Sequence, residues 1–468
     1  MSKPYLLVGT GISCLGAAKL LKATGRAFTF TDQKYCDKRA QPFLSLGGTF
    51  LPEKDCAAGA SPTSGDGASG DESAAFAAAI VSPGIPPKSP LIQKLRALKT
   101  PILTEMDLAK EKIGNTPVIA ITGTNGKSTI CRMVAHILDA FKIPCPMAGN
   151  IGKPLSEIVI SMEGFKAISL ELSSYQLEYM SPMKAQSVIL TNISMDHMER
   201  HGDLKTYLSV KWRALSFLIP GGAFLTDEET FKLAKSFGLK VPDGVRTVVV
   251  SFGCETDSPS EVQIKEKGFS YAGEDIKVHM PFALGAHNTV NAAMAAIAAQ
   301  AACQKPLAAL VAALESYKPL PFRAELIGHF KGFPIINDSK STNMASTLAA
   351  LSGSEEKVLL LLGGEPKTGD DLSLVLEHKD KLTSILAFGP LGKEAFKAFS
   401  QKLDITYYPT LAELLKALPR LLKASPQKVL FSPGGASFDE FSNFEERGRV
   451  FNNAFFAIPT FEKTGMVK

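Results

Sequence analysis

The chain has few of the features that mark membrane proteins, secreted proteins or nucleic-acid-binding proteins. No stretch approaches the roughly 18 consecutive apolar residues that a membrane-spanning helix needs. The opening residues, MSKPYLLVGTG, turn from apolar side chains to glycine too soon for a signal peptide. Lysine and arginine form no block, and the formal net charge of +5 is spread thinly over 468 residues. We therefore expect a cytoplasmic protein that binds neither membranes nor nucleic acids.

The seven cysteines are too few and too scattered to form a disulfide framework. Their number is odd, and no two of them form the C-x-x-C pair that would indicate a metal site or a redox site. Reduced thiols in a cytosolic protein are the expectation. Apolar residues make up 45% of the chain, which is enough for ordinary hydrophobic cores. The length predicts about three domains.

Short apolar strands alternate with helical patterns along the chain, which predicts an α/β protein with parallel sheets covered on both faces. We expect an N-terminal Rossmann-like domain at 1–104, a central P-loop α/β domain at 105–319 and a C-terminal Rossmann-like domain at 320–468. The stretch at 317–323 carries two prolines and is predicted to link the last two domains. The stretch at 56–75, rich in Gly, Ser and Asp, is typical of a flexible surface insertion.

The clearest chemical signal is AITGTNGKSTI at 120–130. A strand enters this loop and a helix leaves it, which is the context of a phosphate-binding loop. Gly123 and Gly126 let backbone N–H groups converge on an anion, and the helix N-terminus adds partial positive charge. Lys127 can neutralise phosphate oxygens, and Ser128 can bind Mg²⁺. The spacing G-x-x-G-K-S is shorter than the usual one, because an isoleucine stands at the position of the usual first glycine.

Further polar groups follow other strands of the same block. Glu171 lies at the end of the strand predicted at 166–172, and His197 follows the strand predicted at 185–193, beside Asp196. Because ligands collect at the carboxyl ends of parallel strands, these groups are candidates to hold a metal ion between phosphates. His197 alone is equally consistent with a structural histidine, and the adjacent carboxylate favours a functional site.

The third block carries a comparable set of groups after its strands. Asp338 and Lys340 lie in INDSKSTN, Lys367 in GGEPKTGDD and Ser437 in SPGGASFDEF. Such side chains bind oxyanions or nucleotide hydroxyls, so this edge is predicted to bind carboxylate and phosphate. For each residue alone, a solvated loop position is an equally good interpretation. Their shared placement after strands favours a site.

The first block has an incomplete dinucleotide-binding pattern. A full G-x-G-x-x-G would require glycine at position 14, where Cys14 stands. Asp32, some 20 residues after the turn, is placed to contact a ribose or a base. Both an NAD site and a site for the diphosphate of another nucleotide are consistent with these residues.

Seven motifs together resemble those of the ATP-dependent Mur ligases. In chain order they are AITGTNGKST, GNIG, SLELSSYQLE, TNISMDHMERH, GAHNTVNAAMA, INDSKSTN and SPGGASFDEFSNFEERG. The resemblance runs from Gly9 to Phe444, and SSYQLE with FDEFSNFEERG resembles the members that add D-glutamate. Folylpolyglutamate synthases share the glycine loop but not the other motifs. The turn GGEPK departs from the more usual GGDGK-like turn, and the insertion at 56–75 has no counterpart.

The resemblance implies ATP-dependent ligation of D-glutamate to UDP-N-acetylmuramoyl-L-alanine in peptidoglycan precursor synthesis, with Mg²⁺ as cofactor. The substrate carboxylate would take the γ-phosphoryl group of ATP, and the amine of D-glutamate would displace phosphate from this acyl phosphate. It further implies three domains that close around the reaction, and a monomer that acts on small molecules.

The resemblance also implies roles for individual residues, each carried over by its motif. The expected ATP contacts are Gly123, Thr124, Asn125, Gly126, Lys127, Ser128, Thr129, Asn288, Arg323 and Asp338. The expected UDP-substrate contacts are Gly11, Ile12, Ser13, Asp32, Ser82 and Asn150. The expected D-glutamate contacts are Lys340, Thr342, Lys367, Ser437 and Phe444. The expected catalytic residues are Lys127, Glu171, His197 and Lys211, and the expected metal ligands are Ser128, Glu171, His197 and Lys211, the last as a carbamate.

Three alternatives stay open on the sequence. A Mur ligase for another amino acid would release ADP with that amino acid and not with D-glutamate. A regulatory protein that uses the loop as a nucleotide switch would bind nucleotide without forming a product. An NAD-dependent dehydrogenase is disfavoured by Cys14 in place of glycine.

Overall fold

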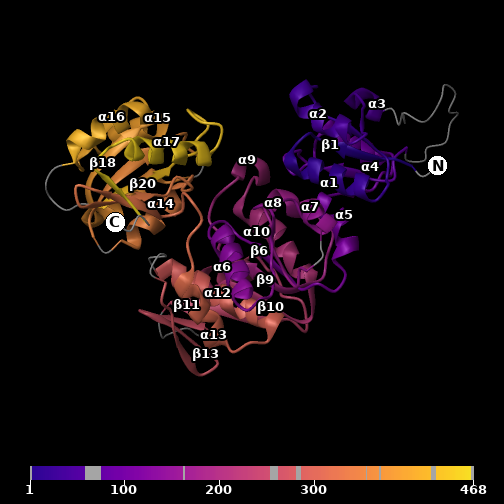
Figure 1. Cartoon of the computed structure of the whole chain (residues 1–468), viewed down its shortest axis with the longest axis horizontal. Coiled ribbons are helices and arrows are strands. Elements are labelled where there is room, and N and C mark those ends of the chain that lie inside the picture. Colours follow the sequence, from indigo (N-terminus) through magenta and orange to yellow (C-terminus); the bar gives the residue numbers. More distant parts are fainter. Residues whose placement is uncertain are drawn as a thin grey trace. The chain divides into compact units, whose positions relative to one another are not determined.

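The computed structural model describes residues 3–57, 75–161, 164–252, 262–280, 286–354, 356–367, 370–422 and 428–464. Within these residues the strands form three sheets, of five, nine and seven strands in chain order (Figure 1). This arrangement confirms the predicted α/β class. Most of the predicted insertion, residues 58–74, lies outside the described residues. The chain forms two compact units, one of them built from Met1–Asn192, Lys205–Gln263 and Met294–Leu310.

The first sheet is parallel throughout and has the strand order β3-β2-β1-β4-β5. Its strands are β1 (Tyr5–Val8), β2 (Phe28–Thr31), β3 (Thr49–Phe50), β4 (Ala79–Val81) and β5 (Ile102–Leu103). The connecting helices are α1 (Ile12–Ala23), α2 (Asp37–Ser45), α3 (Glu53–Ala57) and α4 (Pro90–Ala97). This order matches the first five strands of the doubly wound dinucleotide-binding sheet, as the Rossmann-like prediction expected.

Cys14, which stands where a third glycine was considered, is fully buried on α1. Its Sγ lies 3.5 Å from the Val8 carbonyl oxygen and 3.7 Å from that of Ile80. Burial raises the pKa of this thiol to about 12. The position is therefore a packed contact between helix and sheet.

The second sheet has the order β14-β13-β12-β11-β10-β9-β6-β8-β7. Its strands are β6 (Val118–Thr122), β7 (Met147–Gly149), β8 (Ile168–Glu171), β9 (Ala185–Leu190), β10 (Leu218–Asp227), β11 (Arg246–Phe252), β12 (Val262–Lys265), β13 (Gly268–Tyr271) and β14 (Glu274–Lys277). The pairs from β7 to β11 are parallel, and β13 with β14 is antiparallel. Because β6 lies between β8 and β9, residues after these three strands gather at one edge of the sheet.

Helices and 3-10 turns flank the strands of this sheet. They are α5 (Glu105–Ile113), α6 (Lys127–Ala140), α7 (Leu155–Ile158), η1 (Val159–Ser161), α8 (Ser174–Leu177), α9 (Met198–His201), α10 (Leu204–Trp212), η2 (Arg213–Phe217), α11 (Glu228–Ser236), α12 (Ala286–Cys303), α13 (Leu307–Ala312) and η3 (Ala313–Ser316). Helix α6 begins directly after the glycine loop, as predicted. Helix α12 is rich in alanine, and its Ala292, Ala293 and Ala295 are fully buried.

The third sheet has the order β19-β18-β17-β20-β16-β15-β21. Its strands are β15 (Glu325–Phe330), β16 (Phe333–Asn337), β17 (Val358–Gly363), β18 (Leu382–Phe388), β19 (Ile405–Tyr408), β20 (Lys428–Gly434) and β21 (Phe461–Lys463). Among the strand pairs of this sheet that the described residues form, β15 pairs antiparallel with β16 and β21, and the other pairs are parallel. The helices are α14 (Met344–Ser352), η4 (Leu372–Lys381), α15 (Gly389–Phe399), α16 (Leu411–Leu421) and α17 (Phe444–Phe456).

Strand β17, with the sequence VLLLLG, shows why these sheets are covered on both faces. Leu359 and Leu361 pack into one hydrophobic cluster, and Leu360 and Leu362 pack into another. Because successive side chains of a strand point to opposite faces, a continuous apolar strand must be buried on both sides. None of the described helices is both long and apolar enough to cross a membrane.

Candidate active site

The loop between β6 and α6 has a backbone that only glycine allows at its ends. Gly123 has φ 136° and Gly126 has φ 83°. A Cβ on Gly123 would lie 1.9 Å from the Thr191 Oγ1, so a side chain is excluded by space as well as by conformation. Gly126 caps α6 without a side-chain hydrogen bond, and the first turn of α6 carries no acidic residue. The helix N-terminus therefore has backbone N–H groups and positive potential for an anion.

The two residues after β9 hold this loop in place. The N–H of Thr124 donates to the Asn192 carbonyl oxygen at 2.8 Å, and the N–H of Asn125 donates to Asn192 Oδ1 at 2.9 Å. The Asn125 carbonyl oxygen accepts from Asn192 Nδ2 at 3.1 Å and from Thr191 Oγ1 at 2.6 Å. These hydrogen bonds fix the first half of the loop against the residues that follow β9. Sequence reasoning missed Thr191 and Asn192 as individual residues, although both lie in the motif TNISMDHMERH.

Two lysines donate to the carbonyl groups of the same loop. Lys127 Nζ lies 2.9 Å from the Gly123 oxygen and 2.7 Å from the Thr124 oxygen. Lys211, which is 1% exposed, places its Nζ 2.7 Å from the Gly123 oxygen. It lies in the last turn of α10. The loop therefore collects two cations as well as the N-terminus of α6.

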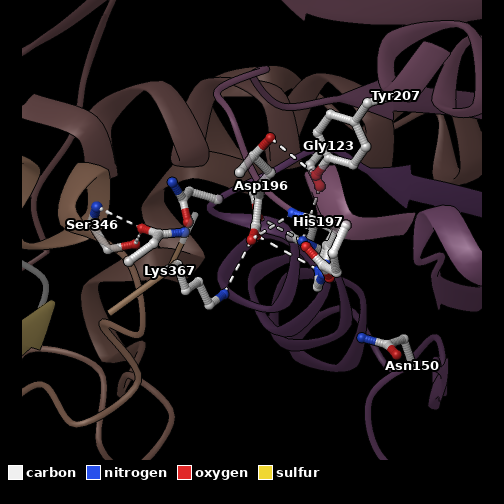
Figure 2. Close-up of polar contacts among 12 residues, drawn as sticks. Gly123, Asn150, Asp196, His197, Tyr207, Ser346 and Lys367 are labelled. Carbon is white, nitrogen blue, oxygen red and sulfur yellow. Dashed lines mark hydrogen bonds and ion pairs between the residues drawn. The ribbon is translucent and has the colours of Figure 1, made fainter. Parts of the chain in front are cut away.

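Tyr207 contacts both the loop and Lys211, and it was not singled out from the sequence. Its ring lies 4.7 Å from the Lys211 Nζ, and its hydroxyl lies 3.3 Å from Thr124 Oγ1 (Figure 2). Tyr207 is 1% exposed, so it supports the loop from inside the protein.

Glu171, the last residue of β8, supplies an unbalanced negative charge at the same sheet edge. The residue is 2% exposed, and its Oε1 accepts a hydrogen bond from Asn150 Nδ2 at 2.8 Å. Its Oε2 is buried without a hydrogen-bond partner among the described residues. Because an unpaired buried carboxylate oxygen is costly, this atom fits a cation. Ser128, also buried, begins α6 from the neighbouring β6.

His197 stands in the left-handed backbone region, with φ 58°, directly before α9. Its Nε2 lies 3.7 Å from Asp196 Oδ2, and its Nδ1 lies 3.5 Å from Glu199 Oε1. Burial lowers the pKa of His197, and the two carboxylates offset part of that effect. A neutral imidazole is the form that binds metal ions. The described residues contain no cluster of three or more His, Cys, Asp or Glu side chains that would hold a metal unaided.

Lys367 is held by a carboxylate from the segment that contains His197. Its Nζ lies 3.1 Å from Asp196 Oδ1 (Figure 2). Asp370, three residues later, accepts a hydrogen bond at 3.1 Å from the N–H of Met344, the first residue of α14. Burial raises the pKa of Asp370 to about 6. Thr342 precedes α14 and is half-buried.

Asp338, after β16, is satisfied by hydrogen bonds. Its Oδ1 accepts from the N–H of Ala324 at 3.0 Å, and its Oδ2 accepts from Ser432 Oγ at 2.9 Å and from Ser341 Oγ. Burial raises the pKa of Asp338, and these hydrogen bonds with the nearby Arg323 guanidinium offset part of that rise. Its carboxylate therefore organises the segment around Arg323.

Arg447 is the main residue of the third sheet that sequence reasoning missed. It is fully buried, with Nε 3.2 Å from Ser339 Oγ and Nη2 2.9 Å from the Ser339 carbonyl oxygen. Its Nη1 lies 3.0 Å from the Gly435 oxygen and 3.2 Å from the Ala436 oxygen. Burial lowers the pKa of Arg447 to about 10, so the side chain stays charged near neutral pH. It joins the turns after β16 and β20, next to the predicted Ser437.

The remaining predicted D-glutamate contacts lie on the same turns and on α17. Ser437 is 2% exposed, and the N–H of Phe441 donates to its carbonyl oxygen at 2.8 Å. Lys340 Nζ lies 4.3 Å from the ring centroid of Phe444, a cation–π contact that fixes both side chains.

Five of the six predicted UDP-substrate residues gather at the carboxyl ends of β1, β2 and β4, whereas Asn150 follows β7 in the second sheet. Asp32 accepts hydrogen bonds on Oδ2 from the N–H of Thr10, at 3.0 Å, and from the Thr10 hydroxyl. Burial opposes ionisation, yet the hydrogen bonds prevail and lower the pKa of Asp32. Gly11 caps α1, followed by Ile12, which is 68% exposed, and by Ser13. Ser82 lies beside Gly11, its Oγ 3.4 Å from where a Gly11 Cβ would stand.

Two further predicted ATP contacts, Asn288 and Thr129, lie in the first turns of helices. Asn288, in the first turn of α12, is 8% exposed and accepts a hydrogen bond from Asn291 Nδ2 at 3.3 Å. Thr129 is half-buried in the first turn of α6. The loop, Glu171 and Asn150 thus meet at one edge of the second sheet, and Asp338, Lys340 and Ser437 follow strands of the third.

Residues 121–299 match the model of the Mur ligase middle domain. The UDP-N-acetylmuramoylalanine--D-glutamate ligase of Enterococcus hirae is 31% identical over 466 residues, which cover 97% of this chain and 96% of that protein. The ligase of the same name from Lactococcus lactis subsp. cremoris (strain MG1363) is 30% identical and covers 96% of each chain. The MurF ligase of Thermotoga maritima in complex with ADP is similar in fold, with a TM-score of 0.60 at 16% identity over 92% of this chain and 95% of that one. The chain therefore belongs to the UDP-N-acetylmuramoylalanine--D-glutamate ligases of the Mur ligase family.

Proposed function

We propose that this protein joins the amine of D-glutamate to the alanine carboxylate of UDP-N-acetylmuramoyl-L-alanine and converts ATP to ADP and phosphate. The observation that carries the proposal is a cationic glycine loop beside a buried carboxylate with an unpaired oxygen, at one edge of the second sheet. Phosphoryl transfer depends mainly on positioning and on neutralisation of charge. Membership of the D-glutamate ligases supports the choice of amino acid.

The chemical problem is that a carboxylate is a poor acyl donor, because its charge repels an amine and oxide is a poor leaving group. Transfer of the γ-phosphoryl group to the carboxylate forms an O–P bond and releases ADP. The amine of D-glutamate then attacks the acyl carbon, a C–N bond forms, and phosphate leaves. In this scheme Lys127 and the N–H groups at the start of α6 bind the phosphates and neutralise the charge that moves between them.

The residues present fit Mg²⁺, which prefers oxygen ligands. Glu171 Oε2 and the Ser128 hydroxyl would hold one ion, His197 would help to hold a second, and a carbamylated Lys211 would be a further metal ligand. When bound, the ion neutralises phosphate charge. Carbamylation of Lys211 replaces a buried ammonium with an anion, and the remaining N–H can still donate to the Gly123 carbonyl oxygen. If the carbamate matters, activity of Lys211→Ala is partly restored by acetate; an inactive variant at every acetate concentration would contradict it.

Three residue sets divide the substrates among three proposed domains, 1–104, 105–319 and 320–468. Gly11, Ile12, Ser13, Asp32, Ser82 and Asn150 would bind the UDP substrate, and Asn288, Arg323 and Asp338 would complete the ATP site. Lys340, Thr342, Lys367, Ser437 and Phe444 would bind D-glutamate, whose two carboxylates match the two lysines in charge. We further propose that one chain acts alone, in the reducing cytoplasm. The free thiols of the six cysteines in the described residues support that compartment.

Mass spectrometry of the product formed from UDP-N-acetylmuramoyl-L-alanine, ATP and D-glutamate tests the proposal directly. We expect the UDP-linked dipeptide, with one ADP released for each amide bond. Parallel reactions with L-alanine and with meso-diaminopimelate serve as controls. Turnover with either control amino acid and none with D-glutamate would overturn the choice of substrate. Nucleotide binding without any product would favour a regulatory role.

A further inference from the structure

The backbone around Arg323 is strained on both sides. Phe322 has φ 64° and Ala324 has φ 45°, so two residues that carry a Cβ adopt the left-handed conformation within three positions. That region is unfavourable for such residues, and Ala has no polar side chain to compensate locally. Backbone of this kind persists only where the surroundings enforce it, and it is concentrated at functional sites.

Three hydrogen bonds enforce this conformation from the third-sheet side. The N–H of Phe322 donates to Glu325 Oε2 at 2.9 Å, and its carbonyl oxygen accepts from the N–H of Lys340 at 3.0 Å. The N–H of Ala324 donates to Asp338 Oδ1 at 3.0 Å. A connection that only had to lead into β15 would have relaxed extended alternatives. The three hydrogen bonds instead hold a bend at Phe322–Ala324, with Arg323 at its centre.

The side chain of Phe322 is seated on a glycine of α17. A Cβ on Gly448 would lie 2.4 Å from Phe322 Cδ1 and 2.9 Å from Cε1, well inside contact distance. Gly448 is helical and has no positive φ, so its backbone does not require glycine. Glycine inside a helix is unfavourable relative to alanine. The absence of a side chain is therefore explained by the phenyl ring that occupies its place.

We propose that Phe322 and Gly448 are positioning residues for nucleotide binding. The ring seated on α17 keeps the strained bend of Phe322–Ala324 in place, and the bend fixes the backbone from which Arg323, a proposed nucleotide contact, extends. The ligand of Arg323 rests on the proposed function. The seat itself rests only on the contacts of Phe322, Gly448 and Asp338.

The test is the affinity of the full-length protein for ADP, measured by calorimetry, together with the KM for ATP and kcat. Gly448→Ala is expected to weaken ADP binding about tenfold. It should raise the KM for ATP by a similar factor and leave kcat at saturating ATP near the wild-type value. Alanine is the better helix former, so α17 is not weakened by this change. Asn453→Ala, at an exposed position of the same helix, is the matched control and should bind ADP as the wild type does.

Double variants show whether the effect passes through the ring and the guanidinium. Phe322→Ala removes the clashing ring, so adding Gly448→Ala to it should cost no further affinity. Adding Gly448→Ala to Arg323→Ala should likewise cost nothing more, because the aimed group is already gone. A packing role without effect on Arg323 would instead make the losses of Gly448→Ala and Arg323→Ala additive, and that additivity would overturn the proposal.

The possible outcomes test two things separately: the positioning role of the contact between Phe322 and Gly448, here called the seat, and the ligase reaction. Wild-type affinity in Gly448→Ala, or a matched fall of kcat and melting temperature, would overturn the seat. A wild type that forms the dipeptide while Arg323→Ala binds ADP normally would also overturn the seat and leave the proposed function intact. Loss of ADP affinity in Gly448→Ala and Arg323→Ala, in a wild type that forms no product, would support the seat and reject the ligase.

Discussion

The candidate sites of the second and third sheets differ in how their buried charges are satisfied. At the second sheet, the Glu171 carboxylate has a buried oxygen without a hydrogen-bond partner among the described residues. At the third sheet, Asp338 accepts three hydrogen bonds, and the fully buried Arg447 donates to four oxygen atoms. The Glu171 carboxylate is incomplete without a cation, whereas the charges of Asp338 and Arg447 are satisfied by the protein itself.

This difference separates residues that act on a ligand from residues that build a site. An unpaired buried charge lowers stability unless a ligand compensates it. The presence of such a charge therefore indicates a role in binding. A saturated buried charge contributes to the fold, and its removal leaves several partners without hydrogen bonds. Variants should therefore lose activity at the second sheet and stability at the third.

The sharpest test of the second sheet is Lys127→Ala. We expect ADP release to fall about a thousandfold, because a cation that neutralises transferred phosphate is lost. Lys127 is half-buried, and its Nζ donates to the carbonyl groups of Gly123 and Thr124, so the free energy of unfolding should change by less than about 0.5 kcal/mol. Binding of UDP-N-acetylmuramoyl-L-alanine should persist. Simultaneous loss of substrate binding and folding would show that the loop is structural.

The matching test of the third sheet is Arg447→Met. Methionine fills a similar length but leaves the Ser339, Gly435 and Ala436 carbonyl oxygens without their donor. We expect the free energy of unfolding to fall by about 3 kcal/mol, measured by urea denaturation. Arg449→Met, at an exposed position two residues along α17, should change it by less than about 0.5 kcal/mol. Full stability of Arg447→Met would remove the contrast between the two sheets.

The sequence predicted the loop because its signal is local. Glycines, lysine and hydroxyl groups follow one another between a strand and a helix, and the elements formed at those residues. The hydrogen bonds from Thr191 and Asn192 to the loop could not be predicted in this way, because they depend on β9 lying next to β6. That neighbourhood is set by packing of the whole sheet, and no local pattern encodes it. The contact between Gly448 and Phe322 could not be predicted for the same reason, because the two residues lie on distant segments of the chain.

Lys211 and Arg447 show a second limit of sequence reasoning. Composition describes Lys211 as an ordinary helix lysine, and only the structure shows it 1% exposed against the Gly123 carbonyl. Arg447 lies in a stretch of Glu and Arg residues that is typical of a solvated helix face. Burial of one member of a charged run depends on the angle at which the helix packs, and this angle is a tertiary property.

Loss of the hydrogen bonds between Asn192 and the glycine loop should have an intermediate effect on nucleotide binding. Asn192→Ala removes one acceptor and one donor from Asn125, so the KM for ATP should rise about tenfold. Asn192→Asp keeps the acceptor for the Asn125 N–H and should lose less. Melting temperature measured beside the kinetics separates the two roles. Equal KM values in the alanine variant and the wild type would mean that the loop is positioned by Thr191 and the lysines alone.

The smallest effect concerns Asp370, an acid of the third-sheet site with a raised pKa. Asp370 has a pKa raised by burial to about 6, against 3.8 for the ordinary group, with a further contribution from Asp196 and an opposing one from Lys367. The folded protein therefore holds this proton more tightly than the unfolded chain does. The stability that Asp370 contributes is fully present below about pH 4 and falls as the pH rises towards 6. Partial exposure limits this loss to about 1 kcal/mol.

Asp370→Asn should remove this dependence and keep the hydrogen bond from the Met344 N–H. Its free energy of unfolding relative to the wild type should rise between about pH 4 and 6 and stay level above that, in urea titrations at each pH. Asp371→Asn is a control of opposite sign, because hydrogen bonds from Ser373 lower the pKa of that exposed carboxyl. The same pH profile in Asp370→Asn and wild type would place the carboxylate in water. Asp370 would then differ from Glu171, whose Oε2 is buried without a hydrogen-bond partner among the described residues.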